Sequence, residues 1–190
     1  MSHSRLILVT GLPGTGKSTL ARALSRSLRL PLLAKDSIKE PLMRVLASRV
    51  VPSRQLSDAA FAILFACVQD CLASGAGVVL EGNFRSGEHE PAIRAALPDP
   101  APSIAQILCR LPESQRQSRL ALRRSDNTRH PGHQPVDEAA RPAACDAFLE
   151  LPGQRLTLDT GAAPEAVEQL ALSELTDWMR ADVQRRAAHA

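Results

Sequence analysis

The chain has 190 residues, which is enough for one domain with a full core, and its 44% hydrophobic and 23% charged residues are those of an ordinary globular protein. A formal net charge of +3 permits an anionic ligand but does not by itself indicate a protein that binds nucleic acid. The first apolar run is too short for a signal peptide, and no window approaches the ~20 apolar residues of a membrane helix. We therefore expect a cytoplasmic protein without membrane association.

An apolar run, Leu6 to Val9, leads into the stretch Gly11-Leu-Pro-Gly-Thr-Gly-Lys-Ser-Thr19. This stretch fits the pattern G-x-x-x-x-G-K-[ST] of the phosphate-binding P-loop, or Walker A motif. The context agrees, because a strand-like run precedes the motif and apolar residues at helical spacing follow it. The sequence therefore predicts a nucleotide site here, with Lys17 near the β and γ phosphates and Ser18 as a ligand of Mg²⁺. The predicted nucleotide-binding residues of the loop are Gly11, Pro13, Gly14, Thr15, Gly16, Lys17, Ser18 and Thr19.

The rest of the chain alternates strand-like and helix-like segments. Strands are predicted at residues 6–9, 31–34, 78–80, 103–109 and 155–159, and helices follow the loop and lie at about 37–48, 57–74, 88–97, from 112, 136–151 and 164–186. A capping box of Ser37 and Glu40 predicts the start of the second helix, and Ser57-Asp58 predicts the start of the third. In the last helix, Val167, Leu170, Leu172, Leu175 and Met179 are expected to face inward. Such alternation predicts an α/β fold, with a parallel sheet covered by helices on both faces.

Polar side chains emerge where the predicted strands end, which is the edge at which open α/β sheets bind ligands. Asp36 follows the second strand and is the candidate base that accepts a proton from a substrate hydroxyl; a helix-capping role and a place in the outer shell of Mg²⁺ are the alternatives. Glu81 stands where a Walker B acid often stands and is a candidate for the metal site. Lys39, Asn83 and Arg85 are expected to face the substrate.

A basic helix and a polar loop follow the fourth strand. Arg116, Arg119 and Arg123 share one predicted helix face; Arg119 and Arg123 in particular are expected to neutralise the phosphates, and a solvated basic face is the alternative. We interpret residues of about 116–135 as a lid within one domain of residues 1–190, with Arg129 or His133 at its tip touching substrate or phosphate when the lid is closed. Thr160, after the last strand, is expected to lie beside the nucleotide base and to contact it through the backbone.

Taken together, the P-loop, Lys35-Asp36-x-x-Lys39, Leu80-Glu-Gly-Asn-Phe-Arg85, the arginine helix, Arg129-His-Pro-Gly-His133 and Leu158-Asp-Thr160 resemble a family of bacterial P-loop predicted kinases. That family is related to chloramphenicol phosphotransferase, zeta toxin, gluconate kinase and the 5′-kinase domain of polynucleotide kinases. The resemblance covers residues of about 5–175. It implies a nucleoside-kinase-like P-loop fold with strand order 2-3-1-4-5, and ATP with Mg²⁺ as the phosphoryl donor.

The resemblance and the residues together predict an ATP-dependent kinase that phosphorylates a hydroxyl of a small molecule. The catalytic residues are then Lys17, Asp36, Arg119 and Arg123. Polynucleotide kinases have an arginine where this chain has Lys39, and aromatic residues for base stacking are scarce, so the sequence argues against a nucleic-acid 5′ end. A polynucleotide or nucleotide-sugar kinase, and a non-catalytic ATP-binding regulator, are the alternatives.

Overall fold

The computed structural model describes residues 4–46, 51–125 and 146–188, without the side chains of residues 124 and 125. Within these residues, five strands form one parallel sheet: β1 (Arg5–Thr10), β2 (Leu32–Ala34), β3 (Val78–Glu81), β4 (Ser103–Arg110) and β5 (Gln154–Asp159). Their order is β2-β3-β1-β4-β5, which confirms the predicted fold class and strand order. The expected lid tip, including Arg129, lies outside the described residues.

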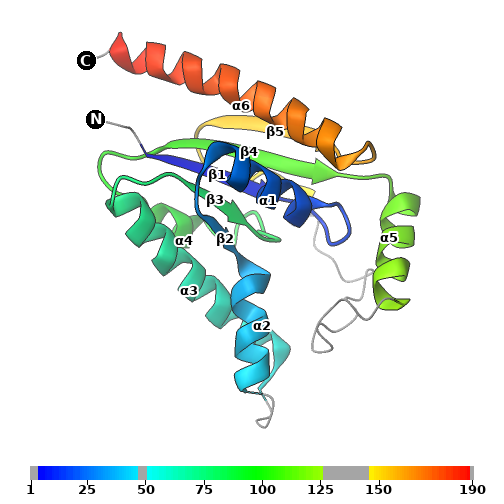
Figure 1. Ribbon diagram of the computed structural model, residues 1–190. Helices are drawn as coiled ribbons and strands as arrows, with labels where there is room; N and C mark the ends of the chain where they lie inside the picture. The colour runs from blue at the N-terminus through cyan, green and yellow to red at the C-terminus, as the bar shows by residue number, and fades with distance from the viewer. Residues whose placement is uncertain (1–3, 47–50, 126–145, 189–190) are drawn as a thin grey trace.

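Two layers of helices cover the sheet (Figure 1). Helices α1 (Lys17–Leu28) and α6 (Pro164–Ala187) pack on one face, and α3 (Ser53–Ala73) and α4 (Glu90–Ala95) pack on the other. Helix α2 (Lys35–Val45) packs against α3, whereas α5 (Glu113–Ser125) stands apart from both layers; the two helices lie near the edge where the strands end (Figure 1). The two remaining helices therefore flank the edge at which a parallel sheet binds its ligands.

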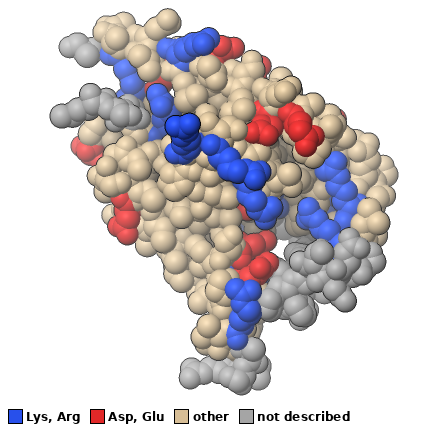
Figure 2. All heavy atoms as spheres, in the orientation of Figure 1, with Lys and Arg blue, Asp and Glu red and all other residues tan. Residues whose placement is uncertain are grey.

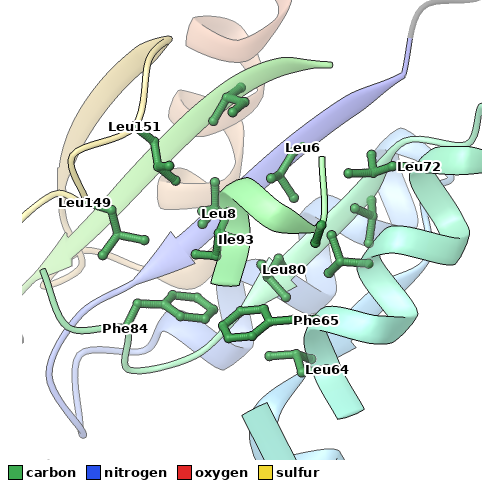
Figure 3. Close-up of a cluster of buried hydrophobic side chains, with 14 residues drawn as sticks. Leu6, Leu8, Leu64, Phe65, Leu72, Leu80, Phe84, Ile93, Leu149 and Leu151 are labelled. Atoms are coloured by element: carbon green, nitrogen blue, oxygen red, sulfur yellow. The ribbon is translucent and has the colours of Figure 1, made fainter. Parts of the chain in front are cut away.

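The core has two parts, one on each face of the sheet. Figure 3 shows the part under α3 and α4, in which Phe65 and Phe84 lie among aliphatic side chains from the strands. Leu149 and Leu151 complete this cluster, and the buried side chain of Gln106 holds their segment by accepting from the N–H of Leu149 and donating to the Leu149 carbonyl. On the opposite face, α1 and α6 bury Leu24, Leu175 and Trp178 against β1 and β4.

Two predicted helix starts are wrong. Helix α2 begins at Lys35 rather than Ser37, because the three-residue strand β2 runs directly into it and Ala34 occupies the N-cap. The proposed capping box therefore does not form at Ser37. Helix α3 begins at Ser53 rather than Ser57, and the Ser57 hydroxyl donates to the Ser53 carbonyl inside the helix.

Two further predictions need correction. Leu170 was expected to face inward but is 51% exposed, and α6 buries Val167, Ala171, Leu175 and Trp178 instead. This face follows the 3.6-residue period from Val167, and position 170 lies off its centre. The end of the helix predicted at 136–151 is not α-helical in residues 146–151, and the earlier part of that segment lies outside the description.

One described helix, α3, is long and apolar enough to cross a membrane by length and composition, whereas the sequence analysis expected none. This is weak evidence, because a core helix of a soluble protein passes the same test. Its Leu64, Val68 and Leu72 are buried in the core on the sheet.

The core packing of α3 can be tested with two neighbouring residues. Leu64→Ala removes a side chain that is 0% exposed, so the free energy of unfolding should fall by about 2–5 kcal/mol. Ile63→Ala, at a position 43% exposed on the same helix, is the matched control and should cost less than about 1 kcal/mol. Urea unfolding of both variants measures the difference; equal losses would contradict the described orientation of α3.

Candidate active site

The loop between β1 and α1 is shaped by close backbone approach. Gly11 has φ 143°, and a Cβ there would lie 2.4 Å from the carbonyl oxygen of Cys109 in β4. Gly16 has φ 80° and is the N-cap of α1, so it offers no side chain to the first helical N–H groups. The first-turn N–H groups of a helix have no intrahelical acceptor, and together with the helix dipole they attract an anion. The loop is therefore built to receive phosphate at the start of α1.

Strand register brings an acid to this loop. Glu81, the last residue of β3, pairs with Val9 of β1 on one side and with Ala34 of β2 on the other. The Ser18 hydroxyl donates to Glu81 Oε1 at 3.2 Å, and Lys17 Nζ lies 3.9 Å from the same oxygen. The structure thus joins the predicted phosphate-binding and metal-binding residues into one contact.

Glu81 is buried, and burial raises the pKa of its carboxyl above the ordinary value. Lys17 and the Ser18 hydroxyl act in the opposite direction, while the negative charge of Asp36 adds to the rise. A buried acid whose neighbours are a lysine, a hydroxyl and a second acid will hold its negative charge more readily when a cation binds beside it.

The donors at this point suit Mg²⁺ better than zinc. In residues 4–46, 51–125 and 146–188, no group of three or more His, Cys, Asp or Glu side chains is placed to hold a metal ion. Mg²⁺ in phosphate sites needs only one or two protein oxygens, because water and phosphate oxygens complete its shell. Ser18 Oγ and Glu81 Oε1 fit that requirement.

A cleft of about 760 Å³ opens from this contact between α1, α2, α3 and the loop after β3. Figure 2 shows basic and acidic side chains meeting around a hollow on this face. The cleft is lined by ten of the residues that the sequence predicted for the site, namely Pro13, Lys17, Ser18, Thr19, Asp36, Lys39, Glu81, Asn83, Arg85 and Arg123. Thus side chains from six separate segments meet in one cavity.

Asp36 lies in the first turn of α2 and lines the cleft. Its side chain is 49% exposed, and its Oδ1 accepts a hydrogen bond from Lys35 Nζ at 2.9 Å. The ammonium of Lys35 is buried in the cleft wall, so a nearby positive charge orients this carboxylate. The carboxylate therefore combines access to the cavity with a fixed partner.

Lys39, one turn along α2, is also buried in the wall. Its ammonium donates to the hydroxyls of Ser53 at 2.9 Å and Ser57 at 2.7 Å, both on α3. Lys39 was predicted to face the substrate; it lines the cleft, and it also ties α2 to α3.

The loop after β3 supplies Asn83 and Arg85 to the cleft. Arg85 pairs with Glu88 at 2.8 Å, and its backbone N–H donates to His89 Nδ1 at 2.8 Å. The buried His89 ring packs against Phe61, and burial lowers its pKa below the ordinary value although Glu88 acts to raise it. A neutral His89 therefore holds the loop that carries two candidate substrate residues.

The three predicted phosphate-clamping arginines of α5 have different surroundings. Arg123 is exposed and lines the cleft. Arg119 is half-buried beside the P-loop, donates to the Thr160 carbonyl at 2.9 Å, and has a guanidinium nitrogen 3.4 Å from where a Cβ on Gly16 would lie. Arg116 is buried and bonds to Glu113 and to the Pro13 carbonyl, so it braces the loop rather than reaching the cleft.

Thr160 and Thr15 fix the loop from the other side. The Thr160 hydroxyl lies 2.6 Å from the Thr15 carbonyl and 2.9 Å from the Arg110 carbonyl, and the Thr15 hydroxyl donates to the Leu12 carbonyl at 2.8 Å. Neither threonine lines the cleft. In this structure Thr160 supports the P-loop, and its predicted contact with a base remains a prediction.

Several side chains in the cleft wall were not among the site residues predicted from the sequence. Arg22, Lys35, Ser53, Ser57 and Phe61 all line the cavity. Arg22 follows Ser18 by four residues and so shares its face of α1, which is a signal that the sequence offered. Lys35 and the two serines depended on the true starts of α2 and α3, and these were predicted incorrectly.

The P-loop, the acid at its side and the sheet order define a P-loop protein of kinase-like fold, which implies nucleotide binding. The model of an AAA-domain family matches residues 6–148, and the chain belongs to this family. A comparison with curated proteins gave no match.

Solved structures of kinases have the same fold. The "putative kinase" from Chloroflexus aurantiacus J-10-fl is 28% identical, with a TM-score of 0.73 over 91% of this chain and 98% of that one. A sugar kinase from Janibacter sp. HTCC2649 is 18% identical, with a TM-score of 0.64 over 93% and 95% of the two chains. The APS kinase of Mycobacterium tuberculosis in complex with AMPPNP and APS is 20% identical, with a TM-score of 0.57 over 93% and 99%. These likenesses confirm the resemblance stated from the motifs; the last two concern the fold alone.

The depressed pKa of His89 has a consequence for stability. The unfolded chain takes up the proton more readily than the folded one, so the stability that neutral His89 provides is complete above about pH 6.5 and is lost as the pH falls from there through the folded-state pKa. Glu81 has a raised pKa and acts in the opposite direction, so a comparison with a variant is needed. Between pH 7.5 and 5.5, wild type should lose more unfolding free energy than His89→Gln in urea titrations. Equal losses would contradict the role given to His89.

Proposed function

We propose that the protein is an ATP-dependent kinase that transfers the γ-phosphoryl group to a hydroxyl of a small-molecule acceptor. The observation that supports this proposal is that one cleft is lined both by P-loop residues and by a second group of polar side chains. Lys17 and Ser18 of the P-loop region line it together with Glu81, and Asp36, Asn83 and Arg85 line the same cavity. A protein that only bound ATP would not need these further polar side chains beside the phosphate loop.

At the donor end, the N–H groups at the start of α1 and Lys17 hold the phosphates of ATP. Arg123 lines the cleft and Arg119 lies beside Gly16, so both are near enough to the loop to neutralise charge on the phosphates. Ser18 and Glu81 would hold Mg²⁺, which neutralises charge on the phosphate oxygens when it is bound.

At the acceptor end, Asp36 accepts the proton of the attacking hydroxyl. Three features support this role: its exposure to the cleft, its orientation by Lys35, and a register that puts the preceding strand beside Glu81. The hydroxyl oxygen then attacks the γ-phosphorus in line, and ADP leaves from the opposite side.

The residues that line the cleft with Asp36 support a small polar acceptor. They include the hydroxyls of Ser37, Ser53 and Ser57, and the charged side chains of Lys35, Lys39 and Arg85, each of which is held by a hydrogen bond within the protein. The solved kinases with this fold include a sugar kinase, a gluconokinase and an APS kinase, all of which are named for small molecules.

The proposal predicts that turnover depends on both ends of the cleft. ADP release with Mg·ATP should be stimulated by one member of a panel of sugars, nucleosides, aminoglycosides, chloramphenicol and 5′-hydroxyl oligonucleotides. Lys17→Ala should lower the stimulated rate by about 100-fold or more, since it removes a charge that acts on the phosphates. Asp36→Asn should lower kcat by about 100–10,000-fold while ATP binding is kept. Asp177→Asn, on the exposed side of α6, is the matched control and should retain full activity.

The outcomes separate the alternatives. Full turnover in Asp36→Asn would remove this residue from the role of base. ATP binding by wild type without stimulation by any acceptor, together with release of a bound protein partner on ATP addition, would favour a regulator. Stimulation only by oligonucleotides would contradict the small-molecule class.

The metal half of the site gives a separate prediction. Glu81→Gln keeps the shape of the side chain but removes its charge, so the Mg²⁺ concentration for half-maximal turnover should rise by about tenfold or more. Glu88→Gln, at an acid that pairs with Arg85 farther along the cleft, is the comparison and should leave the Mg²⁺ requirement unchanged. A Mg²⁺ titration of the rate measures both variants. An unchanged requirement in Glu81→Gln would contradict the metal assignment.

A further inference from the structure

Helix α5 rests on the P-loop. In Figure 1 it stands apart from both helical layers of the sheet. Three of its side chains reach the loop: Arg119 lies beside Gly16, and Arg116 and Leu120 lie against Gly14. A Cβ on Gly14 would lie 3.0 Å from Arg116 Cγ and 3.1 Å from Leu120 Cγ, so the helix is seated on the loop backbone with no room for a side chain between them.

Arg116 is the most constrained of these contacts. The residue is only 3% exposed. Its Nε donates to Glu113 Oε2 at 2.8 Å and its Nη2 donates to Oε1 at 2.5 Å, which is the two-pronged pairing that fixes a guanidinium plane. Its Nη1 then donates to the Pro13 carbonyl at 3.1 Å. A partly exposed carboxylate thus aims a buried cation at one backbone oxygen of the P-loop.

The bond to Pro13 has a geometric consequence for phosphate binding. In a planar trans peptide, the carbonyl of one residue and the N–H of the next point in opposite directions. When Arg116 holds the Pro13 carbonyl toward α5, the N–H of Gly14 is directed away from α5. Gly14 has φ 92° and no Cβ, so side-chain sterics alone do not fix this peptide in its observed orientation.

We propose that Arg116 is a positioning residue for the nucleotide: it fixes the Pro13–Gly14 peptide and so couples the placement of α5 to occupancy of the P-loop. It does not touch the reacting atoms. The inference rests on the nucleotide binding that the proposed function includes, and it does not depend on the acceptor. Because such coupling is reciprocal, a bound nucleotide must stabilise α5 by as much as docked α5 stabilises the bound nucleotide.

Nucleotide affinity tests this directly. A nonhydrolysable ATP analogue with Mg²⁺ is titrated by calorimetry into wild type, Arg116→Gln, Arg116→Lys and Arg180→Gln. Arg116→Gln should weaken binding about tenfold, the range expected when a charged group loses its hydrogen bonds. Arg180→Gln removes the same charge from an exposed site on α6 and should bind as wild type does. Arg116→Lys keeps the charge but not the fork, so its affinity should stay clearly below that of wild type.

Hydrogen exchange supplies a second readout that a merely structural role would not move. In wild type the analogue should slow amide exchange in α5, and in Arg116→Gln this added protection should largely disappear. If Arg116→Gln does not fold, Glu113→Gln releases the guanidinium from an exposed position and should weaken binding several-fold.

The possible failures are distinct. Absence of nucleotide binding by wild type would overturn the proposed function itself. Wild-type affinity in Arg116→Gln, or full recovery of affinity in Arg116→Lys, would overturn the positioning role alone. Wild-type affinity in Glu113→Gln would overturn it when Arg116→Gln is not available.

Discussion

The site depends on one buried carboxylate, that of Glu81 at the end of β3. Glu81 stands between the ends of β1 and β2 by strand register, so any shift of register would take it away from the P-loop. Its burial is compensated by Lys17 and Ser18, the residues that the P-loop motif assigns to phosphate and metal. The carboxylate, the ammonium and the hydroxyl therefore stabilise one another at the end of β3, beside the P-loop.

The two sides of this centre are built differently. The P-loop side is mainly backbone: close glycine contacts at positions 11 and 14 and a helix start, braced from outside by Thr160 and Arg116. The rest of the cleft wall is made of side chains, in which Lys39 ties α2 to α3 and His89 holds the loop after β3. Backbone contacts suit a ligand common to a whole class of proteins, whereas side chains can differ from one protein of the class to another.

The P-loop and the elements on either side of it could be predicted from the sequence, because the motif requires a strand before it and a helix after it. A glycine-rich loop between a buried strand and an amphipathic helix fixes the position of β1 and α1, and the motif resemblance supplied the strand order. The starts of α2 and α3 were not accessible in the same way. Ser37 and Ser57 look like helix caps in sequence, but the three-residue strand β2 leaves no turn before α2, and Pro52 stands at the true N-cap of α3.

The arginines of α5 show a second limit of prediction from sequence, which concerns side-chain burial. Spacing puts Arg116, Arg119 and Arg123 on related faces of a helix, but it does not say how deep each lies. Burial separates them: the first braces the P-loop, the second lies beside Gly16, and the third lines the cleft. Leu170 shows the same limit for an apolar residue. It lies on α6 beside the buried face formed by Val167, Ala171, Leu175 and Trp178, and it is 51% exposed.

The most direct test of the account follows the phosphoryl group itself. ATP carrying ¹⁸O at the three terminal γ-phosphate oxygens would be incubated with the protein, Mg²⁺ and a fractionated small-metabolite extract, and the products would be analysed by mass spectrometry. The account predicts a new phosphate monoester that carries the label and is absent with Lys17→Ala. Label that appears only in inorganic phosphate, or that stays in ATP while ATP is demonstrably bound, would contradict transfer to a small-molecule hydroxyl.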